Sequence, residues 1–489
     1  MLNWLIKLYL SFLILLSGFD FLFAHEKLFY IYEWPQYIDD VWPPQGATLH
    51  NKSAYSPDFR AFNGAGVLLD EKVGLFQTWQ FSLYKNIISR MRTSRYRTRD
   101  PAKASAFIIP FDLGVHSYID HLNGFPRLAS PHGWMAQSLL KAASKNKEIF
   151  WKHYGHDHFV FLSITAYQMV GIGVKTFFMQ ICQNCTTVTI ETSPTKTAIK
   201  GRTRKHWYAV PYPSSFHWYD GIKNLPWERL ENSKRDILSL FIGSLKTSQP
   251  NSNNLRRFLY KQCKDDADCR WYKTAHSCRG VLNATNTMML FRRSIFCPAP
   301  TGDSITRKSV FDALVAGCIP VLFSKATINQ YIWHFTEEEM KTIPIYIPMK
   351  QINEGHVNFM QVLRNISHHD IRAKQKLIER LAPRLQYSIV PDSSSCVSND
   401  TCTQIWDPPF VDAQEVIIRN VLNQKTIEPI NGFTDEELLE QHDRQNYIMS
   451  THEDYAALRR DAPGRKPKWS PKKKITSGLA GVSKIINTV

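Results

Sequence analysis

Residues 295–323 read IFCPAPTGDSITRKSVFDALVAGCIPVLF, a pattern that predicts a strand, a loop, a helix and a second strand. Proline and glycine residues, the last of them Gly302, end the first apolar run. Ser304 or Thr306 is expected to cap the helix, because a short hydroxyl side chain satisfies free N–H groups at a helix start. The apolar run 319–323 is typical of a buried parallel strand.

The loop and the start of this helix have the composition of an anion site. A helix N-terminus after a glycine-containing loop offers unpaired N–H groups and a partial positive charge. Arg307 and Lys308 add full charges and Ser304 adds a hydroxyl donor, so the segment suits a diphosphate. Asp312 follows Lys308 by one turn and could accept a hydrogen bond from a ribose hydroxyl. The alternative is an ordinary α/β crossover with two solvated bases.

The same run resembles the signature of the exostosin-like glycosyltransferases, family 47. Its GDSITR and FDALVAGCIPV segments are similar to those of the plant branch that includes the xyloglucan galactosyltransferases. Animal exostosins and xylan synthases of that family carry an arginine three residues before the acidic position, where this chain has Ser309. The resemblance therefore leaves open whether Arg307 or Lys308 contacts the phosphates.

Further blocks extend the resemblance over roughly residues 27–424. They are YIYEWP at 30–35, DPAKASAF at 100–107, GHDHF at 155–159, AVPYPSSFH at 209–217 and LFIGSLK at 240–246. In GHDHF, His156 stands where the family usually has an arginine. The resemblance implies an α/β fold of the GT-B type, in which two Rossmann-like domains face each other across a cleft. The donor then lies on the second domain and the acceptor mostly on the first.

The body of the chain alternates apolar runs with helical or irregular stretches, as doubly wound parallel sheets do. Strands are expected at 28–32, 106–111, 158–162, 187–190, 207–210, 238–242, 295–297, 319–323 and 343–347, and helices at 79–91 and 411–422. The expected organisation is a signal peptide or signal anchor at 1–24, an N-terminal acceptor-side Rossmann-like domain at 25–210, a C-terminal nucleotide-sugar-binding domain at 211–410, a helix returning to the N-terminal domain at 411–424 and a largely disordered charged tail at 425–489.

Donor-binding candidates also follow a second strand of the C-terminal half, since ligands of such sheets bind beyond the carboxyl ends of the strands. Gly243 and Lys246 come directly after the strand at 238–242. Arg256 lies further on and could face the same diphosphate. Arg256 and Arg257 could equally be surface residues of a helix.

The first half of the chain is expected to supply the acceptor site. Transfer with inversion needs one general base to deprotonate an acceptor hydroxyl, and Glu33, Asp157 and His158 are the candidates. His158 begins a strand and could instead support the site. Asp112 and His116 follow the strand at 106–111 and are the candidates for acceptor binding.

No metal cofactor is expected. Asp266-Ala-Asp268 has the letters of a metal-binding DxD motif, but it lies between two cysteines in a polar loop with no strand before it. We interpret it as a solvated disulfide loop. The resemblance to GT-B enzymes implies that helix dipoles and bases neutralise the leaving nucleotide without a metal.

The net charge of +17 over 489 residues is compatible with nucleic acid, a membrane surface or acidic ligands such as sugar nucleotides. No nucleic-acid motif accompanies the charge, so a nucleic-acid partner is not expected. Much of the excess lies in Arg90–Arg99 and in the tail beyond Arg459. The proline-containing segment 463–474 either contacts acidic polysaccharide or headgroups, or is a solvated tail.

Several features place the body in the secretory lumen, with the Golgi as the expected compartment. Lys7 precedes a short apolar run at 8–16, as in a signal h-region or a retained anchor. Five Asn-x-Ser/Thr triplets begin at Asn51, Asn184, Asn283, Asn365 and Asn399.

The nine cysteines suggest disulfides. Cys396 and Cys402 are expected to pair, and Cys182-x-x-Cys185 is interpreted as part of a structural disulfide. Cys263, Cys269 and Cys278 crowd one region, with Cys297 as a candidate fourth partner. Cys318 lies at the start of an apolar strand and is expected to be a buried free thiol.

Together these features predict a lumenal glycosyltransferase that moves a sugar, best taken as galactose, from a UDP-sugar to a polysaccharide or glycoprotein glycan with inversion. Arabinose, xylose or glucuronic acid are the alternative sugars. A non-catalytic glycan-binding subunit is the alternative from another class, and His156 in place of the usual arginine keeps it open. Expected partners are the UDP-sugar, an oligo- or polysaccharide acceptor, the membrane if the leader is uncleaved, and other glycosyltransferases in a hetero-oligomer.

The compartment can be tested on the protein made in its own cell. We expect N-glycosidase treatment to increase its electrophoretic mobility, because five acceptor triplets follow a leader. We also expect fewer than nine titratable thiols under denaturing, non-reducing conditions. An unshifted band together with nine free thiols would contradict the lumenal assignment.

Overall fold

The structure, a computed structural model, describes residues 27–32, 61–110, 149, 153, 155–165, 185–192, 206–230, 233–272, 284–390 and 405–423. The leader at 1–24, the tail at 425–489 and four of the five Asn-x-Ser/Thr acceptors lie outside these residues. Asn365 is described and is exposed at the end of a helix. Within the described ranges, no helix is long and apolar enough to cross a membrane.

The first half of the chain builds one parallel sheet. Its described strands lie in the order β4-β1-β5-β6-β7-β8. Their bounds are β1 Leu28–Ile31, β4 Arg97–Thr98, β5 Ala104–Ile109, β6 His158–Thr165, β7 Thr186–Glu191 and β8 Trp207–Ala209. Every residue of β6 and β7 is buried, as in strands that are covered on both faces of a parallel sheet.

A second parallel sheet follows, with its described strands in the order β10-β9-β11-β12-β13. The bounds are β9 Ile237–Ile242, β10 Cys269–Tyr272, β11 Ser294–Ala299, β12 Ile319–Leu322 and β13 Ile345–Tyr346. A separate antiparallel hairpin joins β2 Val67–Asp70 to β3 Leu75–Gln77.

Both sheets have the same topology. In each sheet, the first strand in the sequence (β1 or β9) pairs on one side with the second strand (β4 or β10). The later strands follow one after another on its other side. The order therefore reverses between β1 and β5 in the first sheet and between β9 and β11 in the second. In sheets of this kind ligands bind at the carboxyl ends of the strands beside that reversal. The predicted α/β class with two Rossmann-like sheets is confirmed.

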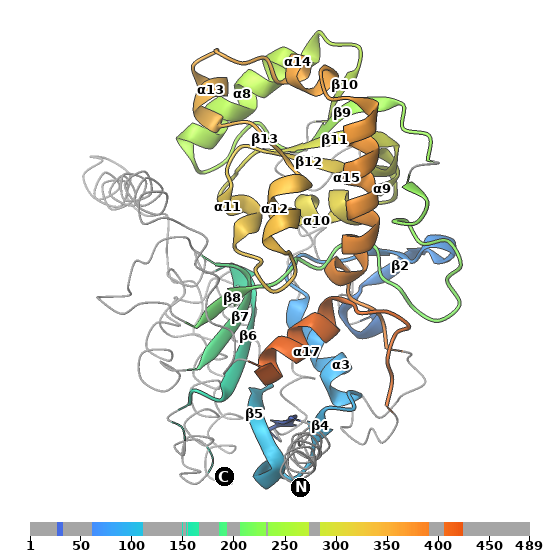
Figure 1. The fold of residues 1–489 in the computed structure, drawn as a ribbon, viewed down its shortest axis with the longest axis vertical. Coiled ribbons are helices and arrows are strands. Elements are labelled where there is room, and N and C mark those ends of the chain that lie inside the picture. Colours follow the sequence, from blue (N-terminus) through green and yellow to red (C-terminus); the bar gives the residue numbers. More distant parts are fainter. Residues whose placement is uncertain are drawn as a thin grey trace, which may run out of the picture. The chain divides into compact units, whose positions relative to one another are not determined.

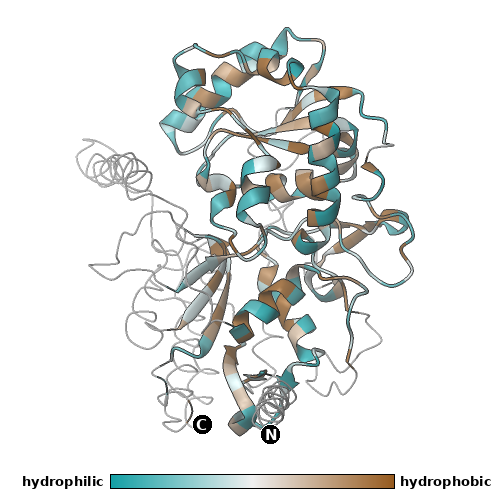
Figure 2. Ribbon diagram, in the orientation of Figure 1, coloured by the Kyte–Doolittle hydropathy of each residue, from teal (hydrophilic) through white to brown (hydrophobic). Residues whose placement is uncertain are grey.

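Helices cover both faces of the second sheet. Figure 1 shows α8, α13 and α14 on one side of it and α10, α12 and α15 on the other. These helices carry apolar residues along with hydrophilic ones, as Figure 2 shows, so the sheet has an apolar covering on each face.

The helices of the described residues have the following bounds: α3 Leu83–Arg92, α8 Pro250–Lys264, α9 Ala284–Arg293, α10 Lys308–Val315, α11 Ala326–Asn329, α12 Glu337–Thr342, α13 Met349–Asn353, α14 Phe359–Arg364, α15 His368–Leu381 and α17 Ala413–Asn423. The 3₁₀ turns are η1 Ala61–Gly64, η2 Glu71–Val73, η3 Pro101–Lys103 and η5 Ala382–Leu385.

Helix α17 packs on α3 and β5 of the first half. The contact is built around Arg90, whose side chain is only 1% exposed. Its guanidinium forms ion pairs with Asp407 and with Glu415, the latter at 3.5 Å, and it lies over the Trp406 ring. The cationic cluster at 90–99 is therefore in part structural, because its first member is buried against the returning segment.

The disulfide predictions are partly wrong. Cys263 pairs with Cys269, and Cys297 pairs with Cys318. Cys318 is therefore not a free thiol. Strands β11 and β12 are neighbours, and Cys297 lies opposite Pro320, two residues after Cys318, so the two sulfurs are close enough to bond. Cys185 is disulfide-bonded, whereas Cys182, Cys278, Cys396 and Cys402 lie outside the described residues.

This pairing predicts the peptide map of the unreduced protein. After proteolysis at low pH with free thiols alkylated, we expect the peptide with Cys297 to be linked to the peptide with Cys318 by mass spectrometry. Reduction should release both, because the bond joins residues 21 positions apart in the sequence. A link from Cys297 to Cys278, or alkylated Cys318, would contradict the pairing.

Candidate active site: a glycine–arginine loop at the second sheet

The loop between β11 and α10 places Arg307 against Gly302. A Cβ at Gly302 would lie 1.8 Å from Nη2 of Arg307, so the guanidinium can occupy this position only beside a glycine. Arg307 is the N-cap of α10, and neither Ser304 nor Thr306 caps the helix as expected. Instead Nη1 of Arg307 donates to Ser304 Oγ and to the Thr306 carbonyl, each at 2.7 Å. Among the described residues, Nε and Nη2 of Arg307 have no partner, so two donor groups are available for a ligand.

The backbone of this loop is less available than the sequence suggests. The Gly302 N–H donates to the Ser304 carbonyl at 3.0 Å, and the Ile305 N–H donates to Glu191 Oε1 at 2.9 Å. Two of the expected anion-binding N–H groups are therefore already used. The charge of Arg307 and the start of α10 remain to hold an anion.

Arg256 connects this loop to the loop after β9. Its Nε donates to the Thr301 carbonyl at 3.0 Å, its Nη1 to Ser244 at 2.6 Å and its Nη2 to Pro300 at 3.1 Å. Burial, and then the charge of Arg307, lower the pKa of Arg256 to about 10, so it stays protonated at neutral pH. Arg256 is thus neither a surface residue nor a free donor; it fixes the two loops that flank the order reversal.

Gly243 and Lys246, the two predicted donor-binding residues directly after β9, differ in their distance from Arg256 and in their exposure. Gly243 lies close to Arg256, because a Cβ there would be 3.5 Å from its Nη1 and 2.6 Å from the Phe241 ring. Lys246 is exposed, and its backbone N–H donates to Ser244 Oγ at 3.0 Å. Gly243 therefore lies beside the Arg256 guanidinium, whereas Lys246 is exposed to solvent.

Lys308 is occupied by contacts inside the protein. Its Nζ donates to Ser215 Oγ at 2.7 Å and to both oxygens of Asp312 at 2.8 Å. An ammonium has three N–H donors, and these three contacts use them. Asp312 is buried and also accepts from the Ser215 N–H at 2.8 Å, so most of its acceptor capacity is already used within the protein and its predicted bond to a ribose stays a prediction. Of the two bases, Arg307 is the one with free donors.

Glu191 is the residue that sequence reasoning missed. It ends β7 and is only 3% exposed, and the described residues that contact its carboxylate are hydrogen-bond donors. Ser304 Oγ and Tyr212 Oη donate to its Oε2 at 2.9 and 3.0 Å, and the Ile305 N–H donates to its Oε1. Burial raises the pKa of Glu191, while the Arg307 charge and these donors oppose that shift. An acidic residue directly after a buried strand was the available sequence signal.

The end of β7 makes further bonds to the second half of the chain. Tyr331 Oη donates to the Ile190 carbonyl at 2.8 Å. Gln330 Oε1 accepts from the Thr192 N–H at 2.8 Å. Beside them, the Tyr208 and Trp333 rings stack at 4.5 Å. The carboxyl end of β7 is therefore bonded to the segment after β12 as well as to the loop after β11.

Two of the predicted bases, Asp157 and His158, lie in a buried cluster. His158 is fully buried; its Nδ1 is 2.8 Å from Asp157 Oδ1 and its Nε2 is 2.7 Å from Tyr32 Oη. Its ring stacks on Phe107 at 4.9 Å. Burial alone would raise the pKa of Asp157, but the hydrogen bond from His158 and its charge bring that pKa below the ordinary value. With both ring nitrogens engaged, His158 is placed to orient Tyr32.

Glu33, Asp112 and His116 lie outside the described residues, and their roles stay predictions. Tyr32 is the last described residue before Glu33, and Ile109 ends β5 before Asp112 and His116. The three residues thus follow the two strands, β1 and β5, between which the order of the first sheet reverses.

A family model, the exostosin GT47 domain, matches residues 25–363. The chain belongs to the exostosin GT47 family. The matched segment holds both sheets, the Gly302–Arg307 loop and Glu191.

Curated relatives of this GT47 chain come from Arabidopsis thaliana. It is 30% identical over 325 residues to the probable xyloglucan galactosyltransferase GT15, covering 64% of this chain and 65% of the relative. It is 28% identical to the probable xyloglucan galactosyltransferase GT17, covering 67% and 70%. It is 26% identical to the xyloglucan galactosyltransferase MUR3, covering 67% and 51%. The chain thus spans between half and about two thirds of the length of these relatives.

Solved structures match the GT47 chain only weakly. The pneumococcal O-GlcNAc transferase GtfA with UDP and GlcNAc has a TM-score of 0.30 at 10% identity and covers 54% of this chain and 59% of its own. The spinosyn rhamnosyltransferase SpnG has a TM-score of 0.29 at 8% identity and covers 63% and 95%. TM-scores this low say nothing about the site. The fold is assigned from the strand order of the two parallel sheets.

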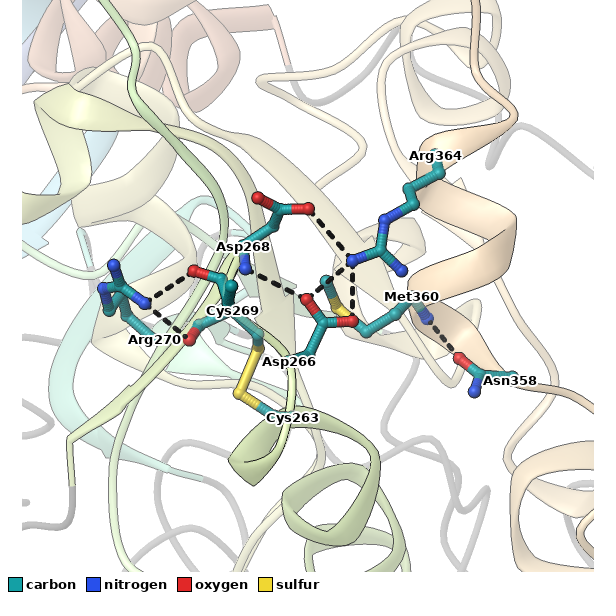
Figure 3. The surroundings of a disulfide bond; sticks show 9 residues. Cys263, Asp266, Asp268, Cys269, Arg270, Asn358, Met360 and Arg364 are labelled. Carbon is teal, nitrogen blue, oxygen red and sulfur yellow. Dashed lines mark hydrogen bonds and ion pairs between the residues drawn. A yellow bond between two sulfur atoms is a disulfide. The ribbon is translucent and has the colours of Figure 1, made fainter.

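The DxD-like segment of this GT47 domain lies in the disulfide loop expected from the sequence. Figure 3 shows Asp266 and Asp268 beside the Cys263–Cys269 bond, with both carboxylates directed toward Arg364 of α14. Nη2 of Arg364 is 2.6 Å from Asp266 Oδ1 and 3.0 Å from Asp268 Oδ2. Asp266 Oδ1 also accepts from the Asp268 N–H at 3.0 Å. The acidic pair thus has a cationic partner within the chain.

This contact predicts how the motif responds to substitution. We expect the double variant Asp266→Ala with Asp268→Ala to keep most of the sugar-transfer activity, because exposed ion pairs contribute little to stability. Transfer should also survive a chelator. Turnover of the wild type and the double variant, measured with and without EDTA, tests both statements. Loss of activity in EDTA that manganese restores would instead assign the pair a metal.

Proposed function

We propose that this chain is an inverting glycosyltransferase that moves a sugar from a UDP-sugar to a polysaccharide or glycoprotein glycan. Galactose is the proposed sugar, since the relatives from Arabidopsis thaliana are named xyloglucan galactosyltransferases. The observation that carries the donor class is the Arg307 guanidinium, with two donor groups unpaired among the described residues. It lies beside the order reversal of the second sheet, where such sheets bind nucleotides.

The donor half of the mechanism rests on Arg307 and the start of α10. As the bond from the anomeric carbon to the diphosphate breaks, negative charge grows on the leaving oxygen. The Nε and Nη2 donors of Arg307 are suited to that charge, and the N-terminus of α10 adds a partial positive charge nearby. Gly302 and Arg256 serve this role indirectly, because one leaves room for the guanidinium and the other holds the two loops together.

The acceptor half needs a general base, and we assign different roles to the three candidates. Both ring nitrogens of His158 are engaged and Asp157 is bonded to that ring, so these two support the site in our proposal. Glu33, which follows Tyr32 in the sequence, is the proposed base. It would take the proton of the acceptor hydroxyl while that oxygen attacks the anomeric carbon from the face opposite UDP.

Transfer of arabinose, xylose or glucuronic acid is the alternative within this class. A non-catalytic glycan-binding subunit is the alternative outside it, and the exposed His156 in place of the usual arginine supports it. The intact Gly302–Arg307 pair favours the enzyme, since a protein that binds glycan alone has no need of a diphosphate ligand.

The location and partners belong to the same proposal. The Asn-x-Ser/Thr triplets and the disulfides support the secretory lumen, with the Golgi as the proposed compartment. Attachment to the membrane through residues 1–24 and assembly with other glycosyltransferases are part of the proposal.

A donor panel tests the function. The purified protein is incubated with UDP-galactose, UDP-arabinose, UDP-xylose and UDP-glucuronic acid in the presence of xyloglucan oligosaccharides, and released UDP is measured. We expect UDP-galactose to give the fastest acceptor-dependent release. In Arg307→Ala we expect turnover to fall roughly a hundredfold, the scale of losing one preorganised transition-state donor. Arg307→Lys should recover only part, because the planar fork is lost.

Arg257→Ala is the matched control, since Arg257 is an exposed arginine next to Arg256 and, within the described part of the chain, makes no hydrogen bond or ion pair with the loop at 300–307. It should keep wild-type turnover. Full activity of Arg307→Ala would refute the donor site, and absence of UDP release from every donor would favour the non-catalytic alternative.

A further inference from the structure

We propose that Glu191 and Tyr212, which come from outside the second sheet, are positioning residues that orient Arg307 for the donor. This inference rests on the proposed function. It assigns the end of strand β7 a role in donor binding, whereas the resemblance implies that the donor lies on the second domain.

A continuous chain of hydrogen bonds runs from Tyr212 to Arg307. Tyr212 Oη donates to Glu191 Oε2 at 3.0 Å, and Ser304 Oγ donates to the same oxygen at 2.9 Å. Nη1 of Arg307 then donates to Ser304 Oγ at 2.7 Å. A hydroxyl has one proton and two lone pairs, so the Ser304 proton directed at Glu191 leaves its lone pairs facing Arg307. The carboxylate thereby sets the orientation of the group that holds the guanidinium.

The members of this chain are themselves firmly held. Glu191 and Tyr212 are each 3% exposed. The Tyr212 ring stacks on Phe311 of α10 at 6.0 Å, so it is fixed by the helix that Arg307 caps. Glu191 also accepts from the Ile305 N–H, which fixes the backbone two residues before Arg307. Side chains locked by packing in this way can hold a binding group in one geometry.

A positioning role differs from two simpler roles for Glu191. If Glu191 acted only through its charge, removing the charge would strengthen UDP binding, because a nearby carboxylate repels a diphosphate. If it only stabilised the fold, its loss would lower the melting temperature and leave the affinity of the folded protein for UDP unchanged. Positioning predicts weaker UDP binding that depends on the presence of Arg307.

The experiment is a double-mutant cycle on UDP affinity, measured by isothermal titration calorimetry with the full chain. The variants are Glu191→Gln and Tyr212→Phe, each made in the wild type and in Arg307→Ala. In the wild-type background we expect each change to weaken UDP binding roughly tenfold, a coupling of the size that contacting residues show. In the Arg307→Ala background we expect almost no further effect, since the group being positioned is gone.

Tyr387→Phe is the matched control. Tyr387 is also buried, and its hydroxyl donates to the Pro211 carbonyl at 2.6 Å, so it loses a comparable hydrogen bond outside this chain of contacts. It should bind UDP as the wild type does. If Glu191→Gln fails to fold, Tyr212→Phe decides the question, because it removes only a hydroxyl and leaves the charge in place.

Three results would overturn the positioning role. They are an equal loss of affinity in both backgrounds, an equal loss in Tyr387→Phe and Tyr212→Phe, and tighter binding by Glu191→Gln. A wild-type protein that binds no UDP would overturn the proposed function itself and the positioning role with it, which separates the two failures.

Discussion

The hydrogen bonds between the Glu191 carboxylate and the loop at 304–305 are the contact on which the arrangement of this protein depends. A buried carboxylate is costly unless donors replace the water that it loses. Here the donors come from Tyr212 and from the loop after β11. The Glu191 carboxylate therefore has its full set of hydrogen bonds only when that loop is in place. The same bonds therefore join two sheets that are far apart in the sequence and give the loop before α10 a fixed shape.

The shape of this loop sets the positions of Arg307 and Arg256, while Lys308 makes its contacts elsewhere. The loop brings Arg307 against Gly302, and Arg256 holds the Pro300 and Thr301 carbonyls directly before that glycine. Lys308 is turned the other way, toward Asp312 and the segment that crosses between the sheets. Two adjacent cations thus have separate roles, one in the structure and one directed to a ligand.

Much of the fold could be predicted from the sequence because its strands are buried on both faces. The runs around β6, β7, β9 and β12 contain few polar side chains apart from hydroxyls, and short apolar runs between helical stretches predict parallel strands. The edge strands β4 and β10 were not predicted, since Arg97 and Arg270 interrupt any apolar pattern there. The Cys297–Cys318 bond could not be predicted, because it depends on which strands are neighbours.

The site was predictable only where its chemistry is local. Gly302, Ser304 and Arg307 lie within one motif, so the sequence shows them together. Glu191 is more than a hundred residues from Ser304 in the sequence, and the bond between them exists only because the carboxyl ends of two sheets meet. Choosing between Arg307 and Lys308 likewise required knowing that Ser215 and Asp312 use the ammonium.

Hydrogen–deuterium exchange of the full chain, with UDP and with uridine, tests the central claim most directly. If the loop at 300–307 holds the diphosphate, UDP will slow exchange in the peptide that spans the end of β11 and the start of α10, and uridine at the same concentration will protect it much less. Protection by UDP that leaves this peptide unchanged, or equal protection by uridine, would contradict the account.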